Sequence, residues 1–108
     1  MRKLEVYFGD RYAGLLSELG KDNYIFSYDD SYLADKDVPP VSVNLPKNQK
    51  VYQSDHIFPV FTNMLPEGAN RRALCRARKV DEEDFFGMLE MICGMDSIGN
   101  VILKKTAK

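Results

Sequence analysis

Apolar and polar residues alternate with a period of two in several short segments of the first half of the chain. Tyr24, Phe26 and Tyr28 fall on one face of such a segment, a pattern typical of a half-buried strand. Between the first two segments, Gly9-Asp10 suits a type II′ hairpin turn because Gly comes first. The pattern predicts five strands: Leu4–Phe8, Tyr12–Leu16, Tyr24–Tyr28, Val41–Leu45 (with Val41, Val43 and Leu45 inward) and Ile98–Lys104.

The apolar period becomes helical after Ser54. A short, imperfect helix is predicted from Ser54 or Asp55 to about Asn63, with Pro59 early in it. Pro66 suits the first position of a second helix, which runs to about Arg78. We expect the small residues of this helix to pack inward and its basic residues to face solvent. The two groups are Ala69, Ala73, Leu74 and Ala77, and opposite them Arg71, Arg72, Arg76, Arg78 and Lys79.

Two further helices have start signals of their own. Asp30-Ser31 can cap one short turn that ends near Ala34. Asp81 is predicted to cap the last helix, which ends at Gly94. An apolar stripe at i, i+3, i+4 and i+7 marks its buried side: Phe85, Met88, Leu89 and Ile92.

The order of these elements predicts an α+β fold. Strands come first, helices follow and one strand ends the chain, which favours a mainly antiparallel sheet of about five strands with about three helices on one side. A length of 108 residues fits a single domain over residues 1–108. We expect a cytoplasmic protein, because no stretch resembles a signal peptide or a membrane span, and Cys75 and Cys93 read as reduced, packed thiols.

Charge and motifs argue against several functions. The net charge is −1, whereas a dedicated nucleic-acid binder normally carries a basic excess. His56 is the only histidine, so a multi-histidine metal site is excluded, and beside Asp55 it reads as a polar pair at a helix start. Nucleophile-elbow, phosphate-loop and kinase motifs are absent, and the segment Gly94–Gly99 reads as a structural turn. The sequence therefore predicts no catalytic residue, no cofactor and no metal.

Two features could contact a partner. Met64 and Leu65 lie where one predicted helix ends before Pro66, and such connections usually lie at the surface. This pair is either a contact site or a staple between the two helices. The basic run that starts with Arg71 and Arg72 is either a solvated helix face or a docking face for an acidic partner.

Short motifs along nearly the whole chain resemble the first N-terminal subdomain of the HipA family of bacterial toxin kinases. The more specific ones are Asn63-Met64-Leu65-Pro66-Glu67-Gly68 and Asp96-Ser97-Ile98-Gly99. Supporting stretches are Val6-Tyr7-Phe8, Ala13-Gly14-Leu15-Leu16, Phe26-Ser27-Tyr28, Tyr32-Leu33-Ala34, Pro40–Pro46, Phe58, Phe61, Arg71-Arg72 and Phe85–Leu89.

The resemblance implies a role in a type II toxin–antitoxin system. In the family, this region precedes a Ser/Thr kinase body, and a helix-turn-helix repressor, HipB, binds the kinase. In three-gene systems the subdomain is a separate antitoxin, HipS, of a shortened kinase, HipT. A HipS-like chain would bind and neutralise a HipA/HipT-like kinase. The expected partner-binding residues are Phe61, Asn63, Met64, Leu65, Pro66, Glu67, Arg71 and Arg72, and we expect Leu65→Asp to weaken binding without unfolding the chain.

Two other functions stay open at this point. The chain could be an accessory lobe of a split HipA-like kinase, needed for activity or substrate choice. It could also help a HipB-like repressor to hold DNA through Arg71, Arg72 and Arg76. No direct binding to nucleic acid and no membrane contact is expected from the chain alone.

Overall fold

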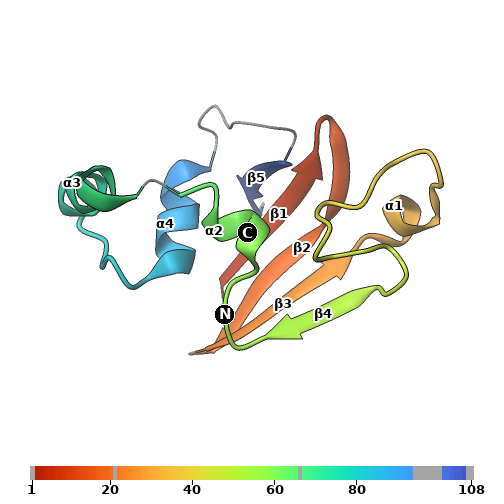
Figure 1. Cartoon of the computed structure of the whole chain (residues 1–108), viewed down its shortest axis with the longest axis horizontal. Helices are drawn as coiled ribbons and strands as arrows, with labels where there is room; N and C mark the ends of the chain where they lie inside the picture. Colours follow the sequence, from red (N-terminus) through yellow and green to blue (C-terminus); the bar gives the residue numbers. More distant parts are fainter. Residues whose placement is uncertain (1, 21, 66, 94–100, 107–108) are drawn as a thin grey trace.

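The computed structural model describes residues 2–20, 22–65, 67–93 and 101–106. In this part of the chain the sheet has the strand order β4-β3-β2-β1-β5, and every neighbouring pair is antiparallel. The α+β fold predicted from the sequence is therefore confirmed. Figure 1 shows the elements, whose bounds are β1 (Arg2–Phe8), β2 (Arg11–Gly20), β3 (Asn23–Tyr28), α1 (Asp30–Ala34), β4 (Val51–Ser54), α2 (Pro59–Thr62), α3 (Gly68–Arg78), α4 (Phe85–Ile92) and β5 (Val101–Lys105).

The first hairpin forms where the turn signal predicts it. Phe8 pairs with Arg11, so the loop consists of Gly9 and Asp10. The φ of Gly9 is +62°, the left-handed value that the first position of a type II′ turn requires. β1, β2 and β3 all extend beyond the predicted segments, because the alternating pattern marks only the buried part of each strand.

One face of the sheet carries the hydrophobic core. Phe26 and Phe61 are fully buried, and their ring centroids lie 6.0 Å apart between β3 and α2. Tyr32 of α1 stacks on Tyr28 of β3 with a centroid distance of 5.8 Å. α4 adds Met88, which is also fully buried. Helices α1, α2 and α4 thus pack on the same face, whereas α3 lies beyond α4, away from the sheet (Figure 1).

The prediction of a strand at Val41–Leu45 is wrong. This segment is a turn in which the Leu45 amide donates to the Ser42 carbonyl at 3.0 Å, and β4 at Val51–Ser54 pairs with β3 instead. The Tyr28 hydroxyl accepts from the Val41 amide at 3.0 Å and donates to the Leu45 carbonyl. Because this one side chain takes both backbone groups, no partner strand is needed. Val41 and Leu45 are buried as predicted, but Val43 is 91% exposed.

The predicted starts of the first two helices need correction. Asp29, and not Asp30 or Ser31, caps α1 by accepting from the Ser31 amide at 3.1 Å. The helix expected from Ser54 or Asp55 to Asn63 shrinks to α2, which begins at Pro59, because Ser54 ends β4. Pro at the first helical position costs no hydrogen bond, so α2 begins there without a side-chain cap.

The last two helices also begin later than predicted. α3 begins at Gly68, and Pro66 lies outside the described residues. Asp84 caps α4 by accepting from the Gly87 amide at 3.0 Å, whereas Asp81 accepts from Glu83 in a preceding turn. The predicted apolar stripe of α4 does face the core, joined by the fully buried Phe86. The predicted stop at Gly94 and the first residues of the strand from Ile98 also lie outside the described residues.

The second face of the sheet carries no described helix. Leaving aside Leu19, which lies at the register shift after Glu18, strand alternation places six apolar or aromatic side chains on this face, and none of them belongs to the core or packs against it. All are partly or well exposed. We call this set the open-face band; it consists of Tyr7, Tyr12, Leu15, Ile25, Val51 and Ile102.

Candidate functional site

The residues expected to bind a partner cluster around the junction of α2 and α3, but they do not share one surface. Asn63 and Glu67 are exposed and Met64 is partly buried. Phe61 is fully buried, and Leu65 is only 5% exposed within the core. The expectation that Leu65 lies at the surface is therefore wrong. Leu65 is a core side chain, as the staple interpretation predicts.

α3 presents a different face to the domain than the sequence predicts. Cys75 is its one buried residue, and Leu74 and Arg71 are partly buried. Residues at i, i+3 and i+4 lie on one side of a helix, so these three define the packed side. The helix turns Leu74 and Cys75 inward because they bury more apolar area than alanine does. The expected inward positions of three alanines are wrong, since all are exposed: Ala69, Ala73 and Ala77.

The basic residues of α3 consequently divide into two groups. The Arg71 guanidinium lies over the ring of Phe85 in α4, 5.6 Å from its centroid, so Arg71 helps to dock α3. Arg72 and Arg76 are exposed. Lys79 ends the helix in the left-handed conformation, with φ of +57°. Arg72 thus stays available for contact, whereas Arg71 is partly engaged within the domain.

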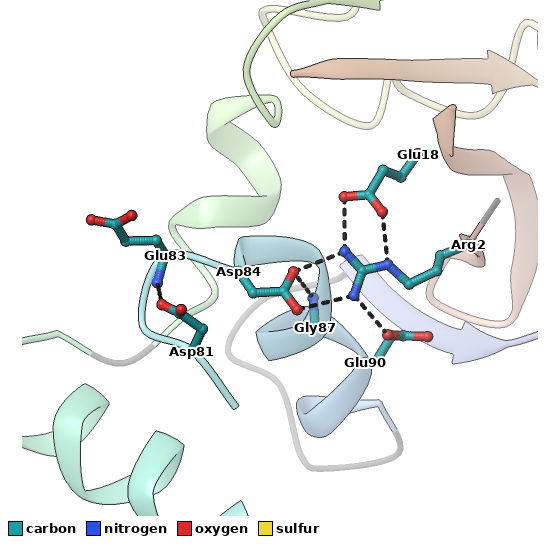
Figure 2. Close-up of polar contacts among 7 residues, drawn as sticks. All are labelled: Arg2, Glu18, Asp81, Glu83, Asp84, Gly87 and Glu90. Atoms are coloured by element: carbon teal, nitrogen blue, oxygen red, sulfur yellow. Dashed lines mark hydrogen bonds and ion pairs between the residues drawn. The ribbon is translucent and has the colours of Figure 1, made fainter. Parts of the chain in front are cut away.

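An ionic cluster that sequence reasoning missed joins the sheet to α4 (Figure 2). The Arg2 guanidinium donates to Glu18 with both Nε and Nη2, at 2.7 and 2.8 Å. It also donates to Asp84 with Nη1 and Nη2, at 3.1 and 2.8 Å, and lies 3.6 Å from a carboxylate oxygen of Glu90. The same guanidinium is 5.2 Å from the ring centroid of Phe86. We call Arg2, Glu18, Asp84 and Glu90 the Arg2 cluster.

The contacts of the Arg2 cluster shift the pKa of Arg2 and of Asp84 in opposite directions. Hydrogen bonds from Arg2 hold the pKa of Asp84 below its ordinary value, and the Gly87 amide adds to this effect. The carboxylates in turn raise the pKa of Arg2. The guanidinium forms bidentate hydrogen bonds with Glu18 and with Asp84, so the Arg2 cluster is a structural clamp between the sheet and α4. Only the cross-strand pairing of Arg2 with Glu18 could have been found from strand register.

The single histidine lies at the surface, beside its chain neighbour Asp55. His56 and Asp55 form an exposed pair, with Nδ1 and Oδ1 2.6 Å apart, in the segment between β4 and α2. The hydrogen bond that His56 donates to the Asp55 carboxylate raises the pKa of His56, and the same contact lowers the pKa of Asp55. The interpretation as a polar pair holds, although the helix starts only at Pro59. A shallow hollow beside the pair is lined by Asp22, Asn23, Gln53, Ser54 and Asp55.

The cysteines and acidic groups provide no metal site in the described ranges. Within them, no three side chains of His, Cys, Asp or Glu come together in a way that could hold a metal ion. Cys75 is buried and Cys93 is half-buried, and both are free thiols. Burial raises the pKa of Cys93 to about 11, which disfavours the reactive thiolate. The Gly94–Gly99 segment lies outside the described residues. Among the described helices, none has the length and apolar character needed to cross a bilayer.

Comparison with known families identifies the domain. The sequence model of the family described as the HipA N-terminal domain matches residues 4–104 of the chain. The chain belongs to the HipA N-terminal domain family. A solved structure described as the N-terminal domain of HipA toxin has the same fold, with a TM-score of 0.69 and 22% identity, over 100% of this chain and 95% of that one. The family match therefore relates this chain to the N-terminal domain of HipA, a toxin.

Two relatives differ in how much of their length this HipA N-terminal domain spans. An uncharacterized protein of Haemophilus influenzae is 30% identical over 89 residues, which make up 82% of this chain and 79% of that protein. A Sinorhizobium fredii protein with the name "Putative kinase Y4mE" is 27% identical over 94 residues. The match covers 87% of this chain but only 22% of the kinase-named relative. The domain thus occurs both in a short protein and as a small part of a long one.

Proposed function

We propose that this chain is a non-catalytic binding module that docks on a HipA/HipT-like Ser/Thr kinase and neutralises it. The observation that carries the proposal is the match of residues 4–104 to the HipA N-terminal domain. The match covers 22% of the kinase-named relative, so most of that relative's chain lies outside the matched segment. A domain supplied as its own chain can occupy the same place on a kinase body and restrict its movement.

Exposed side chains at the α2–α3 junction fit the polar part of such a contact. Asn63, Glu67 and Arg72 are exposed, and Met64 beside them is partly buried. Arginine can pair with a carboxylate through two hydrogen bonds, which gives geometric specificity at the rim of an interface. We therefore keep these four residues as proposed contacts. The core positions of Phe61 and Leu65 remove them from the contact surface.

The test measures the activity of the kinase encoded beside this chain. Purified chain is titrated into the kinase with ATP, and autophosphorylation is followed together with binding by calorimetry. Neutralisation predicts saturable binding and falling phosphorylation. Arg72→Glu should weaken binding, whereas Lys36→Glu, at an exposed position beyond α1, should not. Absence of binding by the unchanged chain would refute the proposal.

A second function follows from the kinase-named relative. Because the domain is part of that longer protein, this chain could serve as an accessory lobe that a split kinase needs for activity or substrate choice. The same titration separates the two functions. Binding with increased phosphorylation supports the lobe, and binding with decreased phosphorylation supports neutralisation.

A further inference from the structure

The open-face band is a continuous apolar surface on one side of the sheet. Strand register sets Ile102, Tyr7 and Tyr12 side by side across β5, β1 and β2. One row further along, Leu15 and Val51 flank Ser27 across β2, β3 and β4. Ile25 belongs to the next row, between Ser17 and Gln53. The band therefore crosses all five strands diagonally.

This composition is unusual for a sheet face that meets water. An antiparallel sheet with one buried face normally alternates apolar residues inward with polar residues outward. Here Val51 is 46% exposed, and none of the six residues packs against the core. Tyr7 and Tyr12 hold each other edge to face, with ring centroids 5.5 Å apart. Rigid aromatic groups of this kind lose little conformational entropy on binding, so they suit an interface.

Charged side chains border the band and carry both signs. Lys104 lies over the ring of Tyr7, with its Nζ 4.5 Å from the centroid. Glu5 pairs across the strands with Lys104 and with Leu15. The Tyr7 hydroxyl donates to Glu5 at 3.3 Å. An apolar centre with a mixed polar rim is the usual anatomy of a protein–protein interface, whereas nucleic acid would require a predominantly basic one.

We propose that the open-face band docks on an apolar surface of the HipA/HipT-like kinase body. This inference rests on the proposed function and adds to the α2–α3 junction a second surface that contacts the kinase. The kinase-named relative supports this occupant, because there a domain of this family has a much larger body in the same chain. The face opposite the core is the part of the described domain where a large neighbour can bury apolar area without displacing a helix. The open-face band is separate from the α2–α3 junction, which lies on the side of the sheet that carries the core.

A matched pair of substitutions tests the surface. Val51→Lys places a charge in the band, on an edge strand where lysine is well tolerated. Val43→Lys makes the same change at a 91% exposed position in the loop held against Tyr28, away from the band. Ile25→Thr removes apolar area from the band without adding charge and keeps a β-branched side chain. Circular dichroism and thermal unfolding establish that each variant is folded.

Calorimetric titration of the purified kinase with each folded variant gives the outcome. We expect Val51→Lys to raise Kd about tenfold or more, Ile25→Thr to raise it a few-fold, and Val43→Lys to leave it unchanged within about twofold. If the unchanged chain does not bind, the proposed function fails. If it binds and both band variants bind equally well, this inference alone fails. If the band instead binds a second copy of this chain, light scattering should show a dimer. Val51→Lys would then dissociate the dimer and leave the affinity for the kinase unchanged, and that result would also overturn the proposal.

Discussion

Removal of the Arg2 guanidinium should destabilise the domain measurably. In Arg2→Ala, the bidentate bonds to Glu18 and Asp84 and the contact with the Phe86 ring are all lost. The side chains of Arg2 and Asp84 are each 35% exposed, so solvent screens part of this attraction. An ion pair of this kind contributes about 0.2–1 kcal/mol and a partly exposed cation–π contact about 0.5–1 kcal/mol. We therefore expect the free energy of unfolding to fall by about 2 kcal/mol.

Urea denaturation followed by circular dichroism measures this loss, and thermal unfolding should show Tm lower by roughly 10 °C. A double-mutant cycle with Glu18→Ala isolates one pair, with an expected coupling of about 0.5–1 kcal/mol. Loss of less than about 0.5 kcal/mol in Arg2→Ala would show that the clamp does not stabilise the fold, because that is the range of ordinary surface substitutions.

The pH dependence supplies an independent check on the Arg2 cluster. The folded pKa of Asp84 lies below its unfolded value, so its contribution is present above an unfolded pKa of about 3.9. This contribution is lost as the pH falls through the lower folded pKa. The native protein should therefore lose more stability than Arg2→Ala on acidification below about pH 4. Parallel curves for the two proteins would mean that Arg2 is not the cause of the shift.

Two further substitutions test the packing. Gly14→Ala should lower the free energy of unfolding in urea by about 3 kcal/mol, because the new Cβ would lie 2.3 Å from the backbone oxygen of Ser27. At Gly20 a new Cβ would meet nothing within 4 Å, so Gly20→Ala should change the free energy of unfolding by less than about 0.5 kcal/mol. The sequence-based expectation that Leu65→Asp leaves the chain folded is replaced by the opposite one, because the substitution places a carboxylate at a 5% exposed core position and should unfold much of the population. Asn63→Asp, at an exposed position, should leave Tm unchanged. A folded, native-like Leu65→Asp would contradict the core assignment.

Periodicity predicted the elements in which burial and pattern coincide. The alternation of Tyr24, Phe26 and Tyr28 identified β3 and its buried face, and all three side chains are buried. In α4, the predicted Met88 and Leu89 are fully buried. Large apolar residues at regular spacing report directly on burial, because little else compensates for leaving several of them in water.

Where the prediction failed, a side chain distant in sequence decided the structure. The alternation of apolar and polar residues at Val41–Leu45 fits a strand and equally a turn whose two ends are buried. The hydrogen bonds of the Tyr28 hydroxyl with Val41 and Leu45 favour the turn. Helix α3 has too few large apolar residues for its sequence pattern to show which side is buried. The contact of Arg71 with the Phe85 ring lies on the side that packs against the domain. Such effects depend on tertiary contacts that local spacing does not encode.

The candidate site was partly predictable. The α2–α3 junction was located, but Phe61 and Leu65 are core residues, since an apolar residue near a helix break can face either way. The Arg2 cluster was not foreseen, because Arg2 and Asp84 are 82 residues apart. The open-face band depends on register across five strands, which becomes known only when the pairing is known.

The pairing of β1 with β5 has a consequence for biosynthesis. β1 is synthesised well before β5, yet its outer edge finds its partner only when Val101–Lys105 has been translated. Until then the nascent chain offers an unsatisfied row of backbone donors and acceptors to any neighbouring polypeptide. Contacts between such distant segments also slow folding, because a long loop must close before they form. Newly made chains should therefore be most prone to aggregate, and to need chaperones, before β5 has emerged from the ribosome.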